Sequence, residues 1–82
     1  MNKFLFPEIK TTRSTTEQAQ KIVDEVNEYL EANSDEEAID VLHAVETFIR
    51  IHFKGREEIL DRLIQSTIEK NSKRGYYQTT CY

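Results

Sequence analysis

Two stretches with the periodicity of an amphipathic helix follow each other in this sequence with almost nothing between them. In residues 15–32 and again in residues 34–53, apolar side chains recur at intervals of three and four. Asn33 and Ser34 form the junction. Because so short a connection cannot carry the chain elsewhere, the two segments are expected to fold back on each other as an antiparallel helical hairpin.

Both predicted helices begin at a recognisable capping signal. Ser14 precedes Glu17 by three residues, and Ser34 precedes Glu37 by the same spacing. This is the pattern of a capping box, in which the serine hydroxyl and the glutamate carboxylate satisfy each other's backbone N–H groups. The pattern therefore fixes where each helix starts.

A third helix is expected over residues 56–74, with Gly75 as a left-handed stop at its end. We expect this helix to pack across the hairpin. Its apolar stripe consists of Ile59, Leu60, Leu63, Ile64 and Ile68.

The composition is that of one small all-α domain. A chain of 82 residues has room for a single domain and lies near the lower limit for an independent core. Only two Gly and one Pro, with 32% charged residues, exclude an all-β fold. We expect one domain, 1–82, with an N-terminal arm at residues 1–13, a helical core at 14–75 and an irregular tail at 76–82.

The charge and the apolar runs exclude several classes of partner. Fifteen acidic residues against eleven basic ones, and a pI of about 5.1, provide no general attraction for nucleic acid or an anionic membrane. No run approaches the ~20 apolar residues that span a bilayer, and Pro7 and Glu8 interrupt the apolar start too early for a signal peptide. With Cys81 as the one cysteine, no internal disulfide is available. The expected location is the cytoplasm.

The second predicted helix carries two stripes. The strongly apolar stripe consists of Ala38, Val41, Leu42, Val45 and Ile49. The other stripe has the spacing of a packed seam and consists of Glu37, Asp40, Ala44, Thr47 and Ile51. A solvent-facing side would not continue as Ala, Thr and Ile. We therefore expect the two carboxylates at its head to point toward another helix or subunit.

Four carboxylates are spaced so that they can meet across the hairpin. Glu25 and Glu28 share one face of the first helix, and Glu37 and Asp40 share one face of the second. At about 1.5 Å per residue, both pairs lie at nearly the same height from the junction. Four like charges need a cation, and oxygen ligands favour Mg²⁺, with Mn²⁺ as an alternative. A site of this kind is suited to hydrolysis of a phosphoanhydride.

Another interpretation of the acids stays open. Paired acidic residues arise easily in a chain with fifteen of them, and Glu37 has an alternative role as the capping partner of Ser34. Glu28 lies nearly opposite the main apolar stripe of its helix, where solvent is the usual neighbour. His43 follows Asp40 by one turn, but on the side of Glu36, so we expect it at the surface or at an interface.

The same acidic residues carry a resemblance to a known family. The run DEVNE at 24–28, EAID at 37–40 and KNSKRGYY at 70–77 resemble the MazG-like members of the all-α nucleotide pyrophosphohydrolase superfamily, over roughly residues 17–77. The motif of that superfamily is EExxE followed by ExxD. Asp24 stands where the motif has its first Glu, and the eight residues between Glu28 and Glu37 form a shorter gap than the family usually has.

The resemblance implies a function. It implies that Mg²⁺ is held at Glu25, Glu28, Glu37 and Asp40, and that a nucleoside triphosphate is hydrolysed to the monophosphate and pyrophosphate, with no catalytic residue beyond the metal ligands. It also implies a homodimer or homotetramer in which the helices of the subunits complete a four-helix bundle. The departures at Asp24 and in the gap, with the short chain, are the basis of an alternative, a catalytically inactive helical interaction module on the same scaffold.

The end of the third helix offers cations for a nucleotide. Basic side chains here would hold phosphates or, alternatively, complement the helix dipole. In the resembling family a Lys, an Asn and an Arg near this place contact the nucleotide. The candidate substrate contacts are Lys70, Asn71 and Arg74, which match those positions, together with Lys21, Lys73 and Tyr76.

Overall fold

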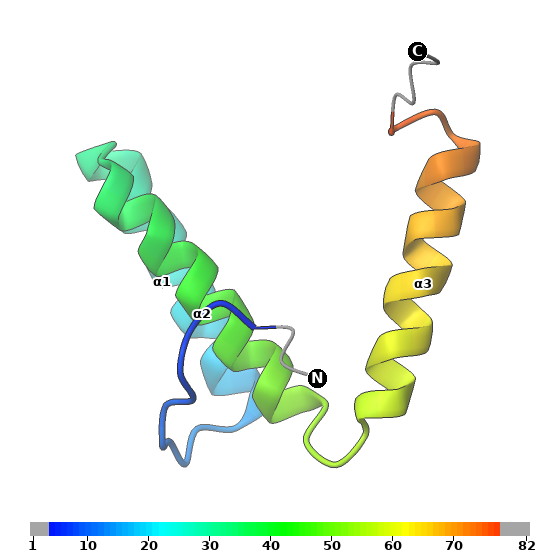
Figure 1. The fold of residues 1–82 in the computed structure, drawn as a ribbon. Coiled ribbons are helices and arrows are strands. Elements are labelled where there is room, and N and C mark those ends of the chain that lie inside the picture. Colours follow the sequence, from blue (N-terminus) through cyan, green and yellow to red (C-terminus); the bar gives the residue numbers. More distant parts are fainter. Residues whose placement is uncertain (1–3, 78–82) are drawn as a thin grey trace.

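The computed structural model describes residues 4–77, and in this range the chain is all-α, with three helices and no strand (Figure 1). The helices are α1 (Thr15–Ala32), α2 (Asp35–His52) and α3 (Glu57–Lys73). The predicted fold class is confirmed, and each predicted segment agrees with its helix to within one residue at most ends. None of the helices in this described range is both long and apolar enough to cross a membrane.

Local signals produce the hairpin of α1 and α2. At the start of α1, the Ser14 hydroxyl accepts from the Glu17 N–H at 3.1 Å, and the Glu17 carboxylate accepts from the Ser14 N–H at 2.8 Å. Asn33 ends α1 in the left-handed region, with φ of 56°. Ser34 is the N-cap of α2. The chain therefore reverses over two residues, as predicted.

The two helices of the hairpin pack through a seam that contains polar side chains. Gln18 is 1% exposed, and its Nε2 donates to the carbonyl oxygen of Ala44 at 3.0 Å. Ala44 and Thr47 of α2 and Glu25 of α1 are also buried. Ala44 and Thr47 belong to the second stripe of α2, so the middle of this stripe is buried as expected, whereas Asp40 near its head is exposed.

The arm, residues 4–13, has no helix or strand and is fixed to α2 by polar contacts. The buried carboxylate of Glu46 accepts the backbone N–H groups of Leu5, at 2.9 Å, and Phe6, at 3.0 Å. Arg50 Nη2 donates to the Phe6 carbonyl at 2.8 Å, and the Phe6 ring stacks on His43. These bonds hold the arm against the outer side of α2.

The placement of α3 differs from the expectation that it packs across the hairpin. Among the helices of residues 4–77, only α1 and α2 pack on one another, and α3 leads away from both (Figure 1). Gly55, with φ of 75°, turns the chain between α2 and α3. Leu60 near the start of α3 is buried beside Phe4 and Phe53. Beyond it, the apolar stripe of α3 is 42–50% exposed at Leu63, Ile64 and Ile68.

The hairpin also leaves large apolar side chains exposed. On α1 these are Val23, Val26 and Leu30, and on α2 they are Ile39 and Leu42. The radius of gyration is 15.3 Å, where about 12 Å is expected for a compact chain of this length. The accessible surface is 6674 Å², about 1,500 Å² more than the ~5,100 Å² expected for a compact monomer of this mass. One copy of the chain therefore leaves much of its apolar surface exposed to solvent.

The seam gives a stability prediction. Gln18→Ala removes the donor to the Ala44 carbonyl in a buried place, so we expect the free energy of unfolding to fall by about 1–3 kcal/mol. The matched control is Gln20→Ala, since Gln20 is exposed and bonds to Asp24 at the surface; a change within about 0.5 kcal/mol is expected there. Urea denaturation followed by circular dichroism, at one protein concentration, measures both. Equal effects would contradict a special role for Gln18.

Candidate metal centre

Three of the four predicted carboxylates converge on one spot between α1 and α2. A carboxylate oxygen from each of Glu25, Glu37 and Asp40 lies within 4.8 Å of the others. Glu25 comes from α1, and Glu37 and Asp40 come from the first two turns of α2. The sequence places the two pairs at equal height from the reversal, and the antiparallel packing brings them side by side.

Glu28 lies at the edge of this group. Its side chain is exposed and outside the set of atoms that lie within 4.8 Å. Burial raises the pKa of Glu37, and the charge of Glu28 raises it further, ahead of the charges of Asp40 and Glu25. Glu28 is therefore close enough to act electrostatically on the cluster without being part of its centre.

The carboxylate of Glu37 is not used as a helix cap. Ser34 accepts from the Glu37 N–H at 3.2 Å, but the reciprocal bond that Glu17 makes at the start of α1 is missing from the start of α2. Instead, Glu37 Oε2 is buried and has no hydrogen-bond partner among the described residues. Of the two roles that the sequence left open for Glu37, the capping role is absent, and its carboxylate is left for the acidic cluster.

The raised pKa of Glu37 has a consequence for stability. A carboxyl group whose pKa is higher in the folded state favours folding while it is protonated, and this contribution is lost as pH rises through the raised pKa. At neutral pH the ionised Glu37 carboxylate therefore works against the fold unless a cation binds beside it. Three oxygen ligands from carboxylates, one of them unpaired and buried, fit a hard divalent cation such as Mg²⁺.

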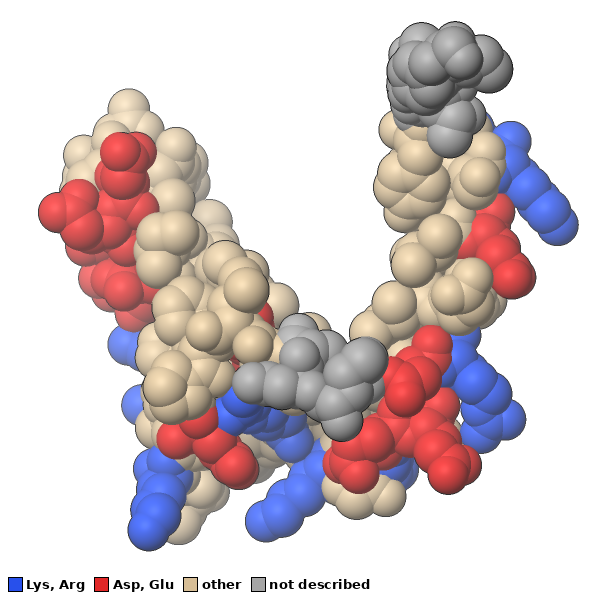
Figure 2. All heavy atoms as spheres, in the orientation of Figure 1, with Lys and Arg blue, Asp and Glu red and all other residues tan. Residues whose placement is uncertain are grey.

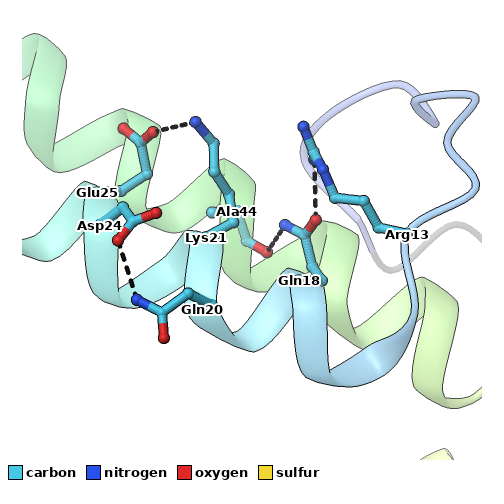
Figure 3. Close-up of polar contacts among 7 residues, drawn as sticks. All are labelled: Arg13, Gln18, Gln20, Lys21, Asp24, Glu25 and Ala44. Carbon is cyan, nitrogen blue, oxygen red and sulfur yellow. Dashed lines mark hydrogen bonds and ion pairs between the residues drawn. The ribbon is translucent and has the colours of Figure 1, made fainter.

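Lys21 brings a positive charge to this cluster from α1. Its Nζ lies 2.7 Å from Glu25 Oε2, and this hydrogen bond raises the pKa of Lys21 (Figure 3). The Lys21 side chain is 41% exposed, so the pair is screened by water and contributes little to stability. Lys21 was a candidate substrate contact, and the structure brings it to the carboxylates.

Asp24 points elsewhere. Its Oδ1 accepts from Gln20 Nε2 at 3.0 Å on the exposed side of α1, away from Glu25 (Figure 3). The position at which the sequence departs from the EExxE motif is therefore outside the cluster.

A cavity of about 260 Å³ opens beside the carboxylates, with Glu25 and Asp40 in its wall. Arg13 from the arm, Gln18 and His43 line it as well. His43 lies beneath the ring of Phe6, with ring centroids 4.5 Å apart, and its Nε2 is buried and unpaired in the described structure.

Sequence reasoning missed Arg13 and Gln18 and placed His43 at the surface or an interface. A signal was available for Gln18, because it continues the three-four spacing of Ile22, Glu25 and Tyr29 on one face of α1. No such signal existed for His43, which becomes part of the cavity wall because the aperiodic arm lies over it.

The candidate contacts at the end of α3 do not join this cavity within one chain. α3 packs on neither α1 nor α2, and its carboxyl end lies far from the hairpin in Figure 1. Asn71 Nδ2 donates to the Tyr77 hydroxyl at 3.4 Å, within the same end of the chain. The residues concerned are Lys70, Asn71, Lys73, Arg74 and Tyr76.

The chain matches no family model, no curated protein and no solved structure. The family suggested by residues 24–28 and 37–40 thus rests on those motifs. The geometry of the carboxylates is compatible with a metal site and points to no particular family.

The cluster gives a metal-binding prediction. Mg²⁺ should raise the melting temperature, because a ligand at 100 times its Kd stabilises the folded state by about 2.7 kcal/mol. Glu37→Ala with Asp40→Ala should abolish this response and leave the melting temperature of the metal-free protein equal or higher, through relieved repulsion. Thermal melts with and without Mg²⁺ measure both effects.

The control removes the same charge elsewhere, with Glu31→Ala and Glu69→Ala on exposed helix positions. It should keep the Mg²⁺ response. Unfolding of the Glu37/Asp40 variant would show instead that these residues are structural, and an equal loss of response in the control would show that Mg²⁺ only screens the overall negative charge.

Proposed function

We propose that this protein is a Mg²⁺-dependent nucleotide pyrophosphohydrolase, which converts a nucleoside triphosphate to the monophosphate and pyrophosphate. The observation that carries the proposal is the meeting of Glu25, Glu37 and Asp40 within 4.8 Å, with one buried carboxylate oxygen unpaired. The likeness of these residues to the EExxE and ExxD motifs supports the reaction type. Bound Mg²⁺ would neutralise the carboxylates and polarise the phosphates of the substrate.

In this proposal the residues of the cluster have different roles. Glu25, Glu37 and Asp40 hold the cation. Glu28, exposed beside them, accepts a hydrogen bond from the attacking water and orients it toward the α-phosphorus. The water oxygen bonds to that phosphorus and passes a proton to Glu28, while the bond between the phosphorus and the bridging oxygen breaks and pyrophosphate leaves. Lys21 exchanges its contact with Glu25 for one with a phosphate oxygen.

We also propose that the active form is a homo-oligomer, with a second copy of the chain on the exposed apolar side chains. The surplus of about 1,500 Å² exceeds the ~800 Å² per partner that a standard interface buries. Charge is complementary as well: acidic side chains gather near the free end of the hairpin (Figure 2), and Lys70 and Lys73 lie in the last turn of α3. Docking of this kind would bring the Lys70 end of one copy toward the acidic hairpin of another.

One observation favours the alternative of an inactive interaction module. Asp24, which takes the place of the first Glu of the motif, is bonded to Gln20 and does not contribute to the cluster. A module of this class would use the exposed apolar surface for binding and would release no product from any nucleotide. Turnover therefore separates the two functions.

Hydrolysis is tested by incubating the protein with canonical and modified nucleoside triphosphates and Mg²⁺ and measuring pyrophosphate. We expect release with at least one nucleotide, and a drop to background in Glu37→Gln with Asp40→Asn, because the cation then has one carboxylate left of three. The control, Glu31→Gln with Glu69→Gln, should stay active. No release from any nucleotide would favour the interaction module.

The oligomer is tested by light scattering coupled to size-exclusion chromatography. We expect a mass of two or four times 9.7 kDa. Val23→Gln with Leu30→Gln should lower the mass toward one chain, since both side chains are at least half exposed in a single copy and their loss costs the isolated fold little. A mass of 9.7 kDa for the unaltered protein at every concentration would overturn the proposal.

A further inference from the structure

A larger hollow lies between the arm and the second half of α2. Its volume is about 880 Å³, within the range of small-molecule sites. Four cationic residues line it, Lys10, Arg13, Arg50 and Lys54, against one acidic residue, Glu8. The chain has a net charge of −4, whereas the residues that line this groove carry a net positive charge. Its wall also carries hydroxyl groups, those of Thr11, Thr12 and Thr47.

Two of the cations are held in place by the fold. Arg50 Nη2 donates to the Phe6 carbonyl, and its guanidinium lies 4.3 Å from the centre of the Phe4 ring. Arg13 Nη1 donates to Gln18 Oε1 at 3.0 Å. Each contact uses one nitrogen of a guanidinium that carries five N–H donors, so both arginines keep donors for a ligand. The groove is thus partly preorganised.

The other two cations are exposed. Lys10 and Lys54 form no ion pair with any other residue in the stretch 4–77. Their ammonium groups are free to turn toward an anion, at the cost of some side-chain entropy. The groove thus combines fixed and mobile positive charge.

The basic groove adjoins the cavity of the carboxylates. Ile9, Arg13 and Thr47 line both hollows. Arg13 and Lys21 extend over the same side of α1, with Gln18 between them (Figure 3). A ligand that reaches from one hollow to the other therefore passes from carboxylates, past Lys21 and Arg13, to a surplus of positive charge.

We propose that the groove binds the phosphate groups of a polyphosphate, so that the pyrophosphate part of the substrate lies along the arm. This inference rests on the proposed function, and it assigns the phosphate-binding role to Lys10, Arg13, Arg50 and Lys54 rather than to the cations at the end of α3. A ligand that carries Mg²⁺ on one part and bare phosphate charge on another matches the change of sign along the two hollows. A continuous nucleic-acid backbone does not, because the carboxylates and Glu8 would repel it.

The test measures binding of inorganic pyrophosphate, with Mg²⁺, by isothermal titration calorimetry to the full chain. Lys10→Gln with Lys54→Gln should weaken binding about tenfold, as two charge-assisted contacts are lost at an exposed site. The lysines are chosen because the arginines also anchor the arm and its contacts. Thermal melts check that the variant is folded.

The matched variant is Lys70→Gln with Lys73→Gln, which removes the same charge from the end of α3. Its affinity for pyrophosphate should stay within about twofold of the unaltered protein. A larger loss in the α3 variant than in the groove variant would overturn the proposal, and so would equal losses in both. Tighter binding of a single-stranded oligonucleotide than of pyrophosphate, sensitive to Lys10 and Lys54, would also overturn it.

Two results separate this inference from the proposed function. If pyrophosphate binding depends on Lys10 and Lys54 but the protein hydrolyses no nucleotide, the groove would still be a polyphosphate site and the proposed enzymatic function would be wrong. If the protein hydrolyses a nucleotide, and neither its KM nor its affinity for pyrophosphate changes when both lysines are replaced, the proposed function would stand and the phosphate-binding role of the groove would be wrong.

Discussion

The reversal of the chain at Asn33 is the constraint on which the rest of the structure depends. A left-handed residue and a serine cap join two helices of equal length, so each residue of α1 faces a fixed position of α2. Gln18 then bonds to the Ala44 carbonyl inside the seam and fixes the axial position of one helix against the other. The meeting of Glu25 with Glu37 and Asp40 follows from these two features, since all three lie within a little over two turns of the reversal.

The carboxylate cluster is negatively charged, and the groove beside it is positively charged. Around Glu37 the fold gathers acids and leaves one buried oxygen without a hydrogen-bond partner in residues 4–77, which opposes folding at neutral pH. Along the arm it gathers cations, two of which are anchored by backbone and ring contacts. A metal and a polyphosphate would each complete one half, and a magnesium complex of a nucleotide would complete both.

The features that could be predicted from the sequence are those set by local signals: the bounds of the helices and the reversal between the first two. Serine caps, three-four spacing and Gly75 located the helices, and counting from Asn33 brought the acidic pairs together. The placement of α3 was predicted wrongly, because its apolar stripe indicates burial without saying what it is buried against. The cavity around His43 was missed because the arm that covers it has no periodicity. Contacts made by a backbone carbonyl or N–H leave no trace in residue type.

The arm is held by backbone contacts of this kind. Glu46 holds it through the N–H groups of Leu5 and Phe6, which every amino acid except proline possesses. As a protein accumulates substitutions over time, position 5 is therefore free to drift in side chain while the anchor persists, whereas the carboxylate at position 46 is not. A family of such chains would show a variable residue at position 5, docked through its N–H on an unchanging glutamate, with proline excluded there.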